Sequence, residues 1–157
     1  MGFGDAMVQT TNFTSGRPIW IWDVSQSVGW VKPNKRSDVA LVQLLINRVM
    51  RYEDLRDSRK RYYQGPDDPL RGRYHGYPPL DFLEVDGWFG PETSNAINAY
   101  QAASPYFRDG VVDPVYPLVA ADAVYTNRTI YQLNNDGLMA YGTMLSEDEF
   151  PPWMTST

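Results

Sequence analysis

The stretch that decides the fold reads Val85-Asp86-Gly87-Trp88-Phe89-Gly90-Pro91-Glu92-Thr93 and continues as Ser94-Asn95-Ala96-Ile97-Asn98-Ala99-Tyr100-Gln101. Asp86-Gly87 predicts a tight turn, because glycine tolerates a positive φ and aspartate can bond its own downstream backbone. Gly90 is a plausible N-cap, and Pro91 suits the first helical position, where no amide hydrogen is needed. One face of the helix then collects Thr93, Ala96, Ile97 and Tyr100. The stretch therefore predicts a turn that leads directly into a helix ending before Ser104-Pro105.

A longer helix is predicted upstream, beginning at Ser37 or Asp38. Ser37 is the candidate cap, and Asp38 places negative charge near the positive end of the helix dipole. The apolar stripe of this helix comprises Val39, Leu41, Val42, Leu45, Ile46, Val49 and Met50. Such a stripe predicts a helix face that packs in the core.

A second turn and a third helix are predicted downstream. Asp109-Gly110 repeats the turn pair of the opening stretch. Thr126 or Asn127 can cap the third helix, and Asp136-Gly137 is its predicted stop. Near the N-terminus, Ile19-Trp20-Ile21-Trp22 predicts a short strand, because it combines β-branched and aromatic residues.

Composition bounds the class of protein. A chain of 157 residues is long enough for one domain with a sizeable core. The formal net charge of −5 argues against general nucleic-acid binding, which needs clustered cations. There is no cysteine and only one histidine, His75, so neither a disulfide framework nor a zinc cluster is expected. No signal peptide and no membrane span are evident, which predicts a cytoplasmic location until lysis or transport within a particle.

Residues 51–79 are predicted to be an insertion in which basic residues outnumber acidic ones and tyrosines are interleaved with the basic residues. One interpretation is a solvated loop. The other is a docking patch for an anionic polymer or a protein, because arginine and tyrosine dominate interface hot spots. The residues chosen as candidate docking anchors in this segment are Arg59, Arg61, Tyr62 and Tyr63.

The C-terminal tail is acidic and proline-rich. Pro151-Pro152 excludes a helix across that pair, so an extended segment is predicted. Chain ends tend to fray, but Phe150 and Trp153 could anchor this one on another surface. Together with Trp20 and Trp22 of the N-terminal arm, they are candidate partner-docking residues.

Two stretches together resemble the peptidoglycan-binding-like domain, a small three-helix module of bacterial cell-wall enzymes and of phage lysis and tail proteins. Asp38-Val39 and Val42-Gln43 are similar to the first helix of that family. The opening stretch is similar to its Val-Asp-Gly-x-Phe-Gly-x-x-Thr-x-x-Ala-Ile-x-x-Tyr/Phe-Gln signature. A weaker similarity to the family extends from Asp109 to Asn134. The resemblance covers residues 27–50 and 83–134, and it leaves out both arms and the insertion.

The resemblance implies a mainly α fold: a three-helix bundle with extended N- and C-terminal arms and a long loop insertion. The implied division is an arm with a short strand at 1–26, the domain at 27–135 and a tail at 136–157. Val42-Gln43 and Tyr100-Gln101 suggest a pseudo-repeat in which Gln43 and Gln101 satisfy backbone groups of the loops.

The resemblance also implies binding of peptidoglycan rather than catalysis. Candidate glycan-binding residues are Trp30, Asp38, Asp86, Trp88, Phe89, Thr93, Asn95 and Tyr100. No catalytic residue, cofactor or metal is expected, since neither an activated nucleophile nor a calcium-loop spacing is present. Glu84 and Asp86, with Val85 between them, would share a face as a carboxylate pair on a strand, whereas a turn does not require this. The alternative is a structural component of a phage particle or contractile injection machine, in which other particle proteins would be the partners and the arms and insertion would dock.

Overall fold

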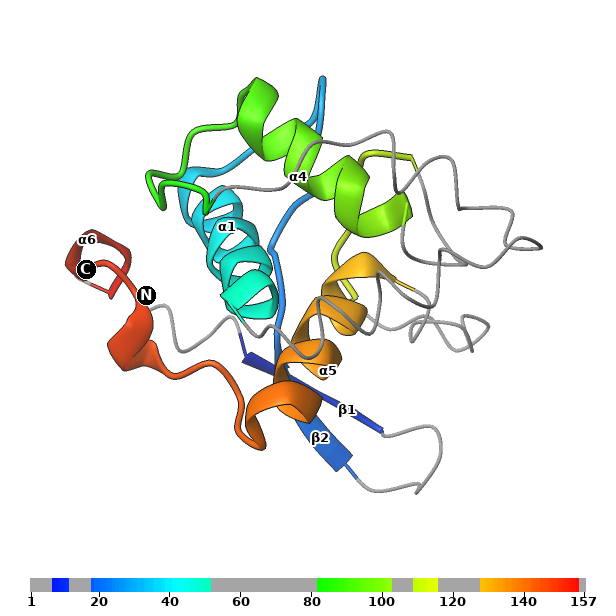
Figure 1. Ribbon diagram of the computed structural model, residues 1–157, viewed down its shortest axis with the longest axis vertical. Coiled ribbons are helices and arrows are strands. Elements are labelled where there is room, and N and C mark those ends of the chain that lie inside the picture. The colour runs from blue at the N-terminus through cyan, green and yellow to red at the C-terminus, as the bar shows by residue number, and fades with distance from the viewer. Residues whose placement is uncertain (1–6, 12–17, 52–81, 103–108, 116–127, 156–157) are drawn as a thin grey trace.

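The computed structural model describes residues 7–11, 18–51, 82–102, 109–115 and 128–155. Within these ranges the chain is mainly α-helical, and its main helices are α1 (Arg36–Arg51), α4 (Pro91–Ala102) and α5 (Thr129–Tyr141). Helix α1 contacts both α4 and α5, and it lies between them in Figure 1. The predicted mainly α core of three packed helices is confirmed.

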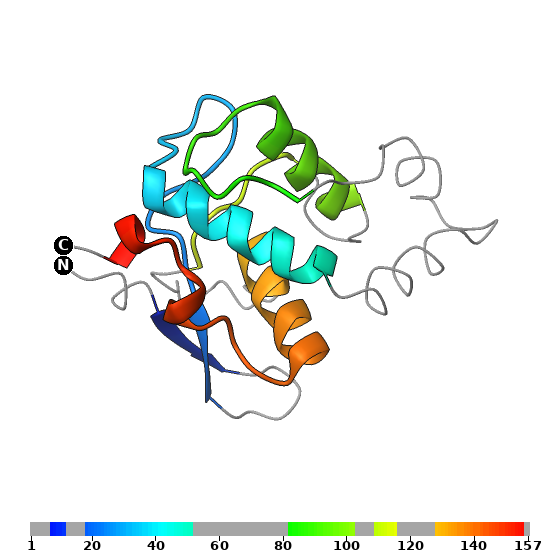
Figure 2. The same cartoon turned by 60° about the vertical axis from the view of Figure 1, so that its left-hand side comes forward.

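Helix α1 is buried on all sides rather than along one stripe. Every residue from Asp38 to Val49 is buried, including the polar residues Gln43, Asn47 and Arg48. The apolar stripe packs against α5 and β2, whereas the polar side chains lie under loops to which they are hydrogen-bonded. Figure 2 shows α1 crossing the molecule with the segment before α4 running beside it.

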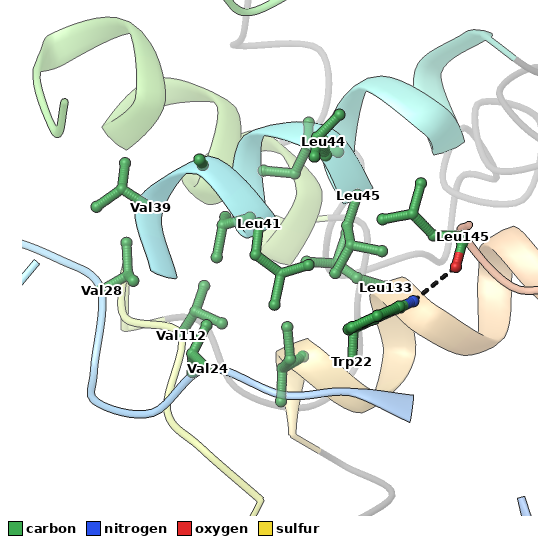
Figure 3. Packing of buried hydrophobic residues seen from close by; sticks show 14 of the residues in the cluster. Trp22, Val24, Val28, Val39, Leu41, Leu44, Leu45, Val112, Leu133 and Leu145 are labelled. Carbon is green, nitrogen blue, oxygen red and sulfur yellow. Dashed lines mark hydrogen bonds between the residues drawn. The ribbon is translucent and has the colours of Figure 1, made fainter. Parts of the chain in front are cut away.

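A single hydrophobic cluster holds these elements together. Leu41 and Leu45 of α1 meet Leu133 of α5 and Trp22 of β2 in its centre (Figure 3). Each fully buried side chain of this size contributes about 1.5–3 kcal/mol to folding. Trp22 also donates its indole N–H to the carbonyl oxygen of Leu145, at 2.6 Å, so the tail is tied to the core.

A two-stranded antiparallel sheet flanks the helices. Strand β1 (Met7–Thr11) pairs with β2 (Pro18–Trp22), with Met7 opposite Trp22 and Thr11 opposite Pro18. The predicted strand is thus confirmed as β2, but β1 was not predicted within the polar arm. Val8, Thr10 and Thr11 favour a strand, but they lie in a polar segment rich in glycine, serine and threonine, and a strand this short forms only because a partner is available.

A backbone bridge closes the other side of the core. Val28 and Val112 exchange both backbone hydrogen bonds, at 3.0 and 2.8 Å, and both side chains are fully buried. The segment after the second Asp-Gly turn is thereby attached to the segment that leads into α1.

The predicted boundaries of α5 are wrong at its C-terminal end. The helix continues through Asp136-Gly137 to Tyr141 and ends at Gly142, whose φ is 75° and whose N–H donates to the Leu138 carbonyl oxygen at 2.7 Å. Gly137 serves close packing instead, because a Cβ there would lie 2.7 Å from Nη1 of Arg48. At the N-terminal end the cap residue is Arg128, without a side-chain cap, whereas Thr126 and Asn127 lie outside the described residues.

The tail is not simply extended, which corrects the prediction. A capping box between Ser146 and Glu149 forms the 3-10 turn η3 (Glu147–Glu149). The short helix α6 (Pro152–Thr155) begins at Pro152, where the proline ring fixes φ and no amide hydrogen is needed. Proline therefore prevented a helix across the pair but allowed one to start at its second member.

Along the described ranges, none of the helices is both long enough and apolar enough to traverse a bilayer.

Candidate binding site at the first Asp-Gly turn

The first Asp-Gly turn is clamped by the side-chain amide of Gln43. Gln43 Nε2 donates to the Trp88 carbonyl oxygen at 3.2 Å, and its Oε1 accepts the Gly87 N–H at 3.0 Å. The same Nε2 contacts Asp86 Oδ1 at 3.2 Å and Thr93 Oγ1 at 3.0 Å. One buried amide of α1 therefore joins both sides of the turn and the first turn of α4.

Gln101 of α4 repeats this arrangement at the second Asp-Gly turn. Its Nε2 donates to the Val111 carbonyl oxygen at 3.0 Å, and its Oε1 accepts the Gly110 N–H at 2.7 Å. Thr129 Oγ1, at 3.0 Å, occupies the place that Thr93 has in the first clamp. The predicted pseudo-repeat, with two glutamines that satisfy loop backbone groups, is confirmed.

The two turns also share their local geometry. Gly87 and Gly110 have φ values of 77° and 76°, a region that glycine enters without steric cost. Asp86 Oδ1 accepts the Trp88 N–H at 2.9 Å, and Asp109 Oδ1 accepts the Val111 N–H at 3.0 Å. The aspartates thus form the turns, as their residue type predicted.

Three asparagines act as additional clamps that the sequence analysis missed. Asn47 bonds both backbone groups of Leu83, at 2.8 and 2.7 Å, and Asn134 bonds both of Trp22, at 2.8 and 2.9 Å. Asn34 does the same with Gly29, at 2.8 Å each. The available signal was the position of Asn47, one helical turn after Gln43 and so on the same face.

Three of the candidate ligand residues are exposed. Trp88 and Trp30 are 67% and 58% exposed, and Asn95 is exposed on α4. Trp30 packs edge-to-face on the partly buried Phe89, with ring centroids 5.0 Å apart. The loop before α1 and the turn before α4 thus bring together aromatic side chains that lie far apart in the sequence.

A surface cavity of about 300 Å³ lies beside Trp88 and Phe89. Its lining combines aromatic, acidic and amide groups: Gln43, Leu83, Glu84, Asp86, Trp88, Phe89, Gly90, Pro91, Glu92 and Thr93. This mixture of apolar faces with a few fixed polar groups is typical of sites for small polar ligands.

Other candidate ligand residues serve the interior instead. Asp38 is buried and accepts hydrogen bonds from the backbone N–H and hydroxyl of Ser25 and from the backbone N–H of Gln26. Thr93 is buried under Gln43, and Tyr100 is buried with its hydroxyl donating to Asp136. These side chains stabilise the fold from within and are not on the surface, where a glycan would bind.

The candidate docking residues divide in a similar way. Trp22 and Phe150 are both buried, and they pack edge-to-face with ring centroids 4.9 Å apart. The Phe150 anchor is therefore used within this chain, and Trp153 lies half-buried over Arg36. Strand β2 contains Trp20, whose side chain lies outside the described residues, as do all of Arg59, Arg61, Tyr62 and Tyr63.

Metal chemistry gains no support from the described part of the chain, which contains no group of three or more histidine, cysteine, aspartate or glutamate side chains that could hold an ion. Asp109 and Asp113 are instead engaged by Val111 and Ser27. No family model matches the chain, and comparison with curated proteins and with solved structures finds no match either.

Proposed function

We propose that this protein is a non-catalytic module that binds peptidoglycan through the surface around the first Asp-Gly turn. The observation that carries the proposal is that the exposed Trp88 lines the cavity together with Phe89, on which the exposed Trp30 packs edge-to-face. Sugar rings present apolar faces that pack on aromatic side chains, while their hydroxyl and acetamido groups need polar partners. Glu84 and Glu92 in the cavity lining offer acceptors for such donors.

The clamps support binding because they make the surface rigid before a ligand arrives. Trp88 has its N–H bonded to Asp86 and its carbonyl oxygen bonded to Gln43. A site that is already ordered loses less conformational entropy on binding. The similarity of residues 85–101 to the family signature points to the same ligand class.

Co-sedimentation with insoluble sacculi tests the proposal. We expect the protein to pellet with sacculi, and Trp88→Ala and Trp30→Ala each to reduce the bound fraction severalfold. Tyr141→Ala is the matched control, since Tyr141 is also an exposed aromatic residue but lies at the end of α5. Failure of the wild-type protein to pellet would refute the proposal, as would equal binding by all variants.

A second candidate function is assembly within a phage particle or contractile injection machine. The loop at residues 29–34 favours it. Val31 at its tip is fully exposed and has a φ of 62°, which is an unusual conformation for a β-branched residue. Asn34 braces this loop against Gly29. Mass spectrometry of purified particles should then find the chain at stoichiometric copy number, and its absence from all particles would exclude this function.

A further inference from the structure

We propose that Arg36 is a carboxylate-binding residue, held ready between Trp88 and Trp153. The inference rests on the proposed function and narrows the ligand to one that carries a carboxylate beside a sugar ring. Arg36 stands at the start of α1, and the tail brings α6 to the same end of that helix (Figure 2).

Three contacts fix the guanidinium. Arg36 Nε donates to the Asp86 carbonyl oxygen at 3.1 Å. Its Cζ lies 4.1 Å from the ring centroid of Trp153 and 5.5 Å from that of Trp88. Tryptophan is the aromatic residue that attracts a guanidinium most strongly. These contacts restrain the side chain, although the residue as a whole is exposed.

The unused donors of Arg36 are what make it a candidate site. A guanidinium has five N–H donors, and one of them is bonded to Asp86. Within the described ranges, neither Nη1 nor Nη2 of Arg36 donates a hydrogen bond, and the residue is exposed. A planar fork of this kind binds a carboxylate through two parallel hydrogen bonds.

Gly87 is packed closely against Arg36 and Trp153. A Cβ at residue 87 would lie 2.4 Å from Arg36 Cγ, 2.6 Å from the Arg36 carbonyl oxygen and 3.0 Å from Trp153 Cη2. Only glycine lets the turn approach the arginine and the tail at this distance. The Asp-Gly turn, α1 and α6 thus converge on one side chain.

Trp88 connects Arg36 to the cavity, because it lines the cavity and also lies beside the guanidinium. A carboxylate is repelled from the cavity itself by Glu84 and Glu92. Outside the cavity, Arg36 and its exposed neighbours Lys32 and Lys35 carry positive charge in a chain of net charge −5. A ligand with its ring on Trp88 would therefore direct its carboxylate toward Arg36.

The test compares three small probes by NMR titration of the full chain, following the indole N–H signals of Trp88 and Trp153. The probes are N-acetylmuramic acid, which has a carboxylate on the sugar, neutral N-acetylglucosamine, and N-acetyl-D-alanyl-D-alanine, which has a peptide carboxylate. We expect N-acetylmuramic acid to bind about tenfold more tightly than N-acetylglucosamine, the gain typical of a hydrogen bond to a charged group. Tighter binding of the peptide would instead assign the same carboxylate site to the peptide part of the polymer.

The variants separate a ligand-binding arginine from a structural one. Arg36→Gln should abolish the difference between acidic and neutral sugars, and Arg36→Lys should restore only part of it, because lysine keeps the charge but lacks the fork. Lys35→Gln is the matched control, with the same loss of charge one residue away, and should preserve the difference. Equal affinity of the wild type for both sugars would overturn the inference, as would an Arg36→Gln variant that still distinguishes them.

Co-sedimentation with sacculi distinguishes this inference from the proposed function. Wild-type protein that pellets, but shows no preference for the acidic sugar, retains the function and loses the carboxylate site. Protein that fails to pellet, but prefers the acidic sugar through Arg36, retains the site and loses the function.

Discussion

The amide nitrogen of Gly87 lies 3.0 Å from the side-chain oxygen of Gln43, although the two residues are 44 positions apart in the chain. This hydrogen bond attaches the turn before α4 to helix α1. The same bond joins Gly110 to Gln101 at 2.7 Å. Twice in this fold, therefore, a glutamine on one helix clamps the turn that precedes the next helix.

Replacing Gln43 with leucine should destabilise the protein strongly. Leucine keeps most of the volume but leaves the Gly87 N–H, the Trp88 carbonyl oxygen and Thr93 Oγ1 without this partner. Since each buried orphan group costs about 1–3 kcal/mol, we expect a loss of about 3 kcal/mol or more in the free energy of unfolding, measured with urea. Gln26→Leu is the control, because its side chain is exposed, and it should change stability by less than about 0.5 kcal/mol. Similar losses for both variants would contradict the clamp.

Gly87→Ala and Gly142→Ala form a matched pair of substitutions. Both glycines have φ near 75°, so alanine costs about 1–2 kcal/mol at either position. A Cβ at residue 142 meets nothing within 4 Å, whereas one at residue 87 clashes with Arg36. Overpacking costs about 1–3 kcal/mol, so Gly87→Ala should be the more destabilising variant by that amount. Equal midpoints of urea unfolding would show that the approach of the turn to Arg36 is not constrained.

The effect of Gly137→Ala on the stability of the protein should depend on the residue at position 48. Alanine in a helix interior normally stabilises by about 0.5–1 kcal/mol relative to glycine. Here the added Cβ would lie 2.7 Å from Nη1 of Arg48, a 7% exposed side chain that also donates to the Thr143 carbonyl oxygen at 2.7 Å.

We therefore expect Gly137→Ala to be neutral or destabilising in the wild-type background and stabilising in Arg48→Met. A double-mutant cycle measured by thermal unfolding should give a coupling energy of about 0.5–3 kcal/mol. Additive effects of the two substitutions would mean that Arg48 moves away from Gly137 without cost.

Phe150→Ala should cost about 3–5 kcal/mol, the range found for buried phenylalanine. Phe150 is 6% exposed and packs on Trp22, so the tail is part of the core rather than a free docking arm. Asp148→Ala is the control in the same tail, because Asp148 is exposed. Urea unfolding measures both, and an effect of Phe150→Ala as small as that of the control would indicate a tail that detaches from the core.

Local patterns predicted the helices and both turns because their physical causes are local. The apolar spacing of α1, Pro91 at the start of α4 and the two Asp-Gly pairs act within a few residues of chain. Strand β1 and the full length of α5 were not predicted, because pairing with β2 and packing of Gly137 on Arg48 depend on distant segments.

The candidate site was predicted only in part for the same reason. Residue type identified Trp30, Trp88 and Phe89 as aromatic candidates, but it could not distinguish them from Tyr100, which is buried. Arg36 carried no local signal, because its contact with Trp153 joins segments that are far apart in the sequence.

The sequence by itself determined where the turns form and which helix face is apolar, because backbone preference and hydrophobic spacing are properties of short segments. Only the tertiary structure decided which polar groups became clamps and which aromatic side chains stayed exposed. Burial and hydrogen-bond partners are set by segments that meet after folding, as when Gln43 meets Gly87 and the tail places Trp153 over Arg36.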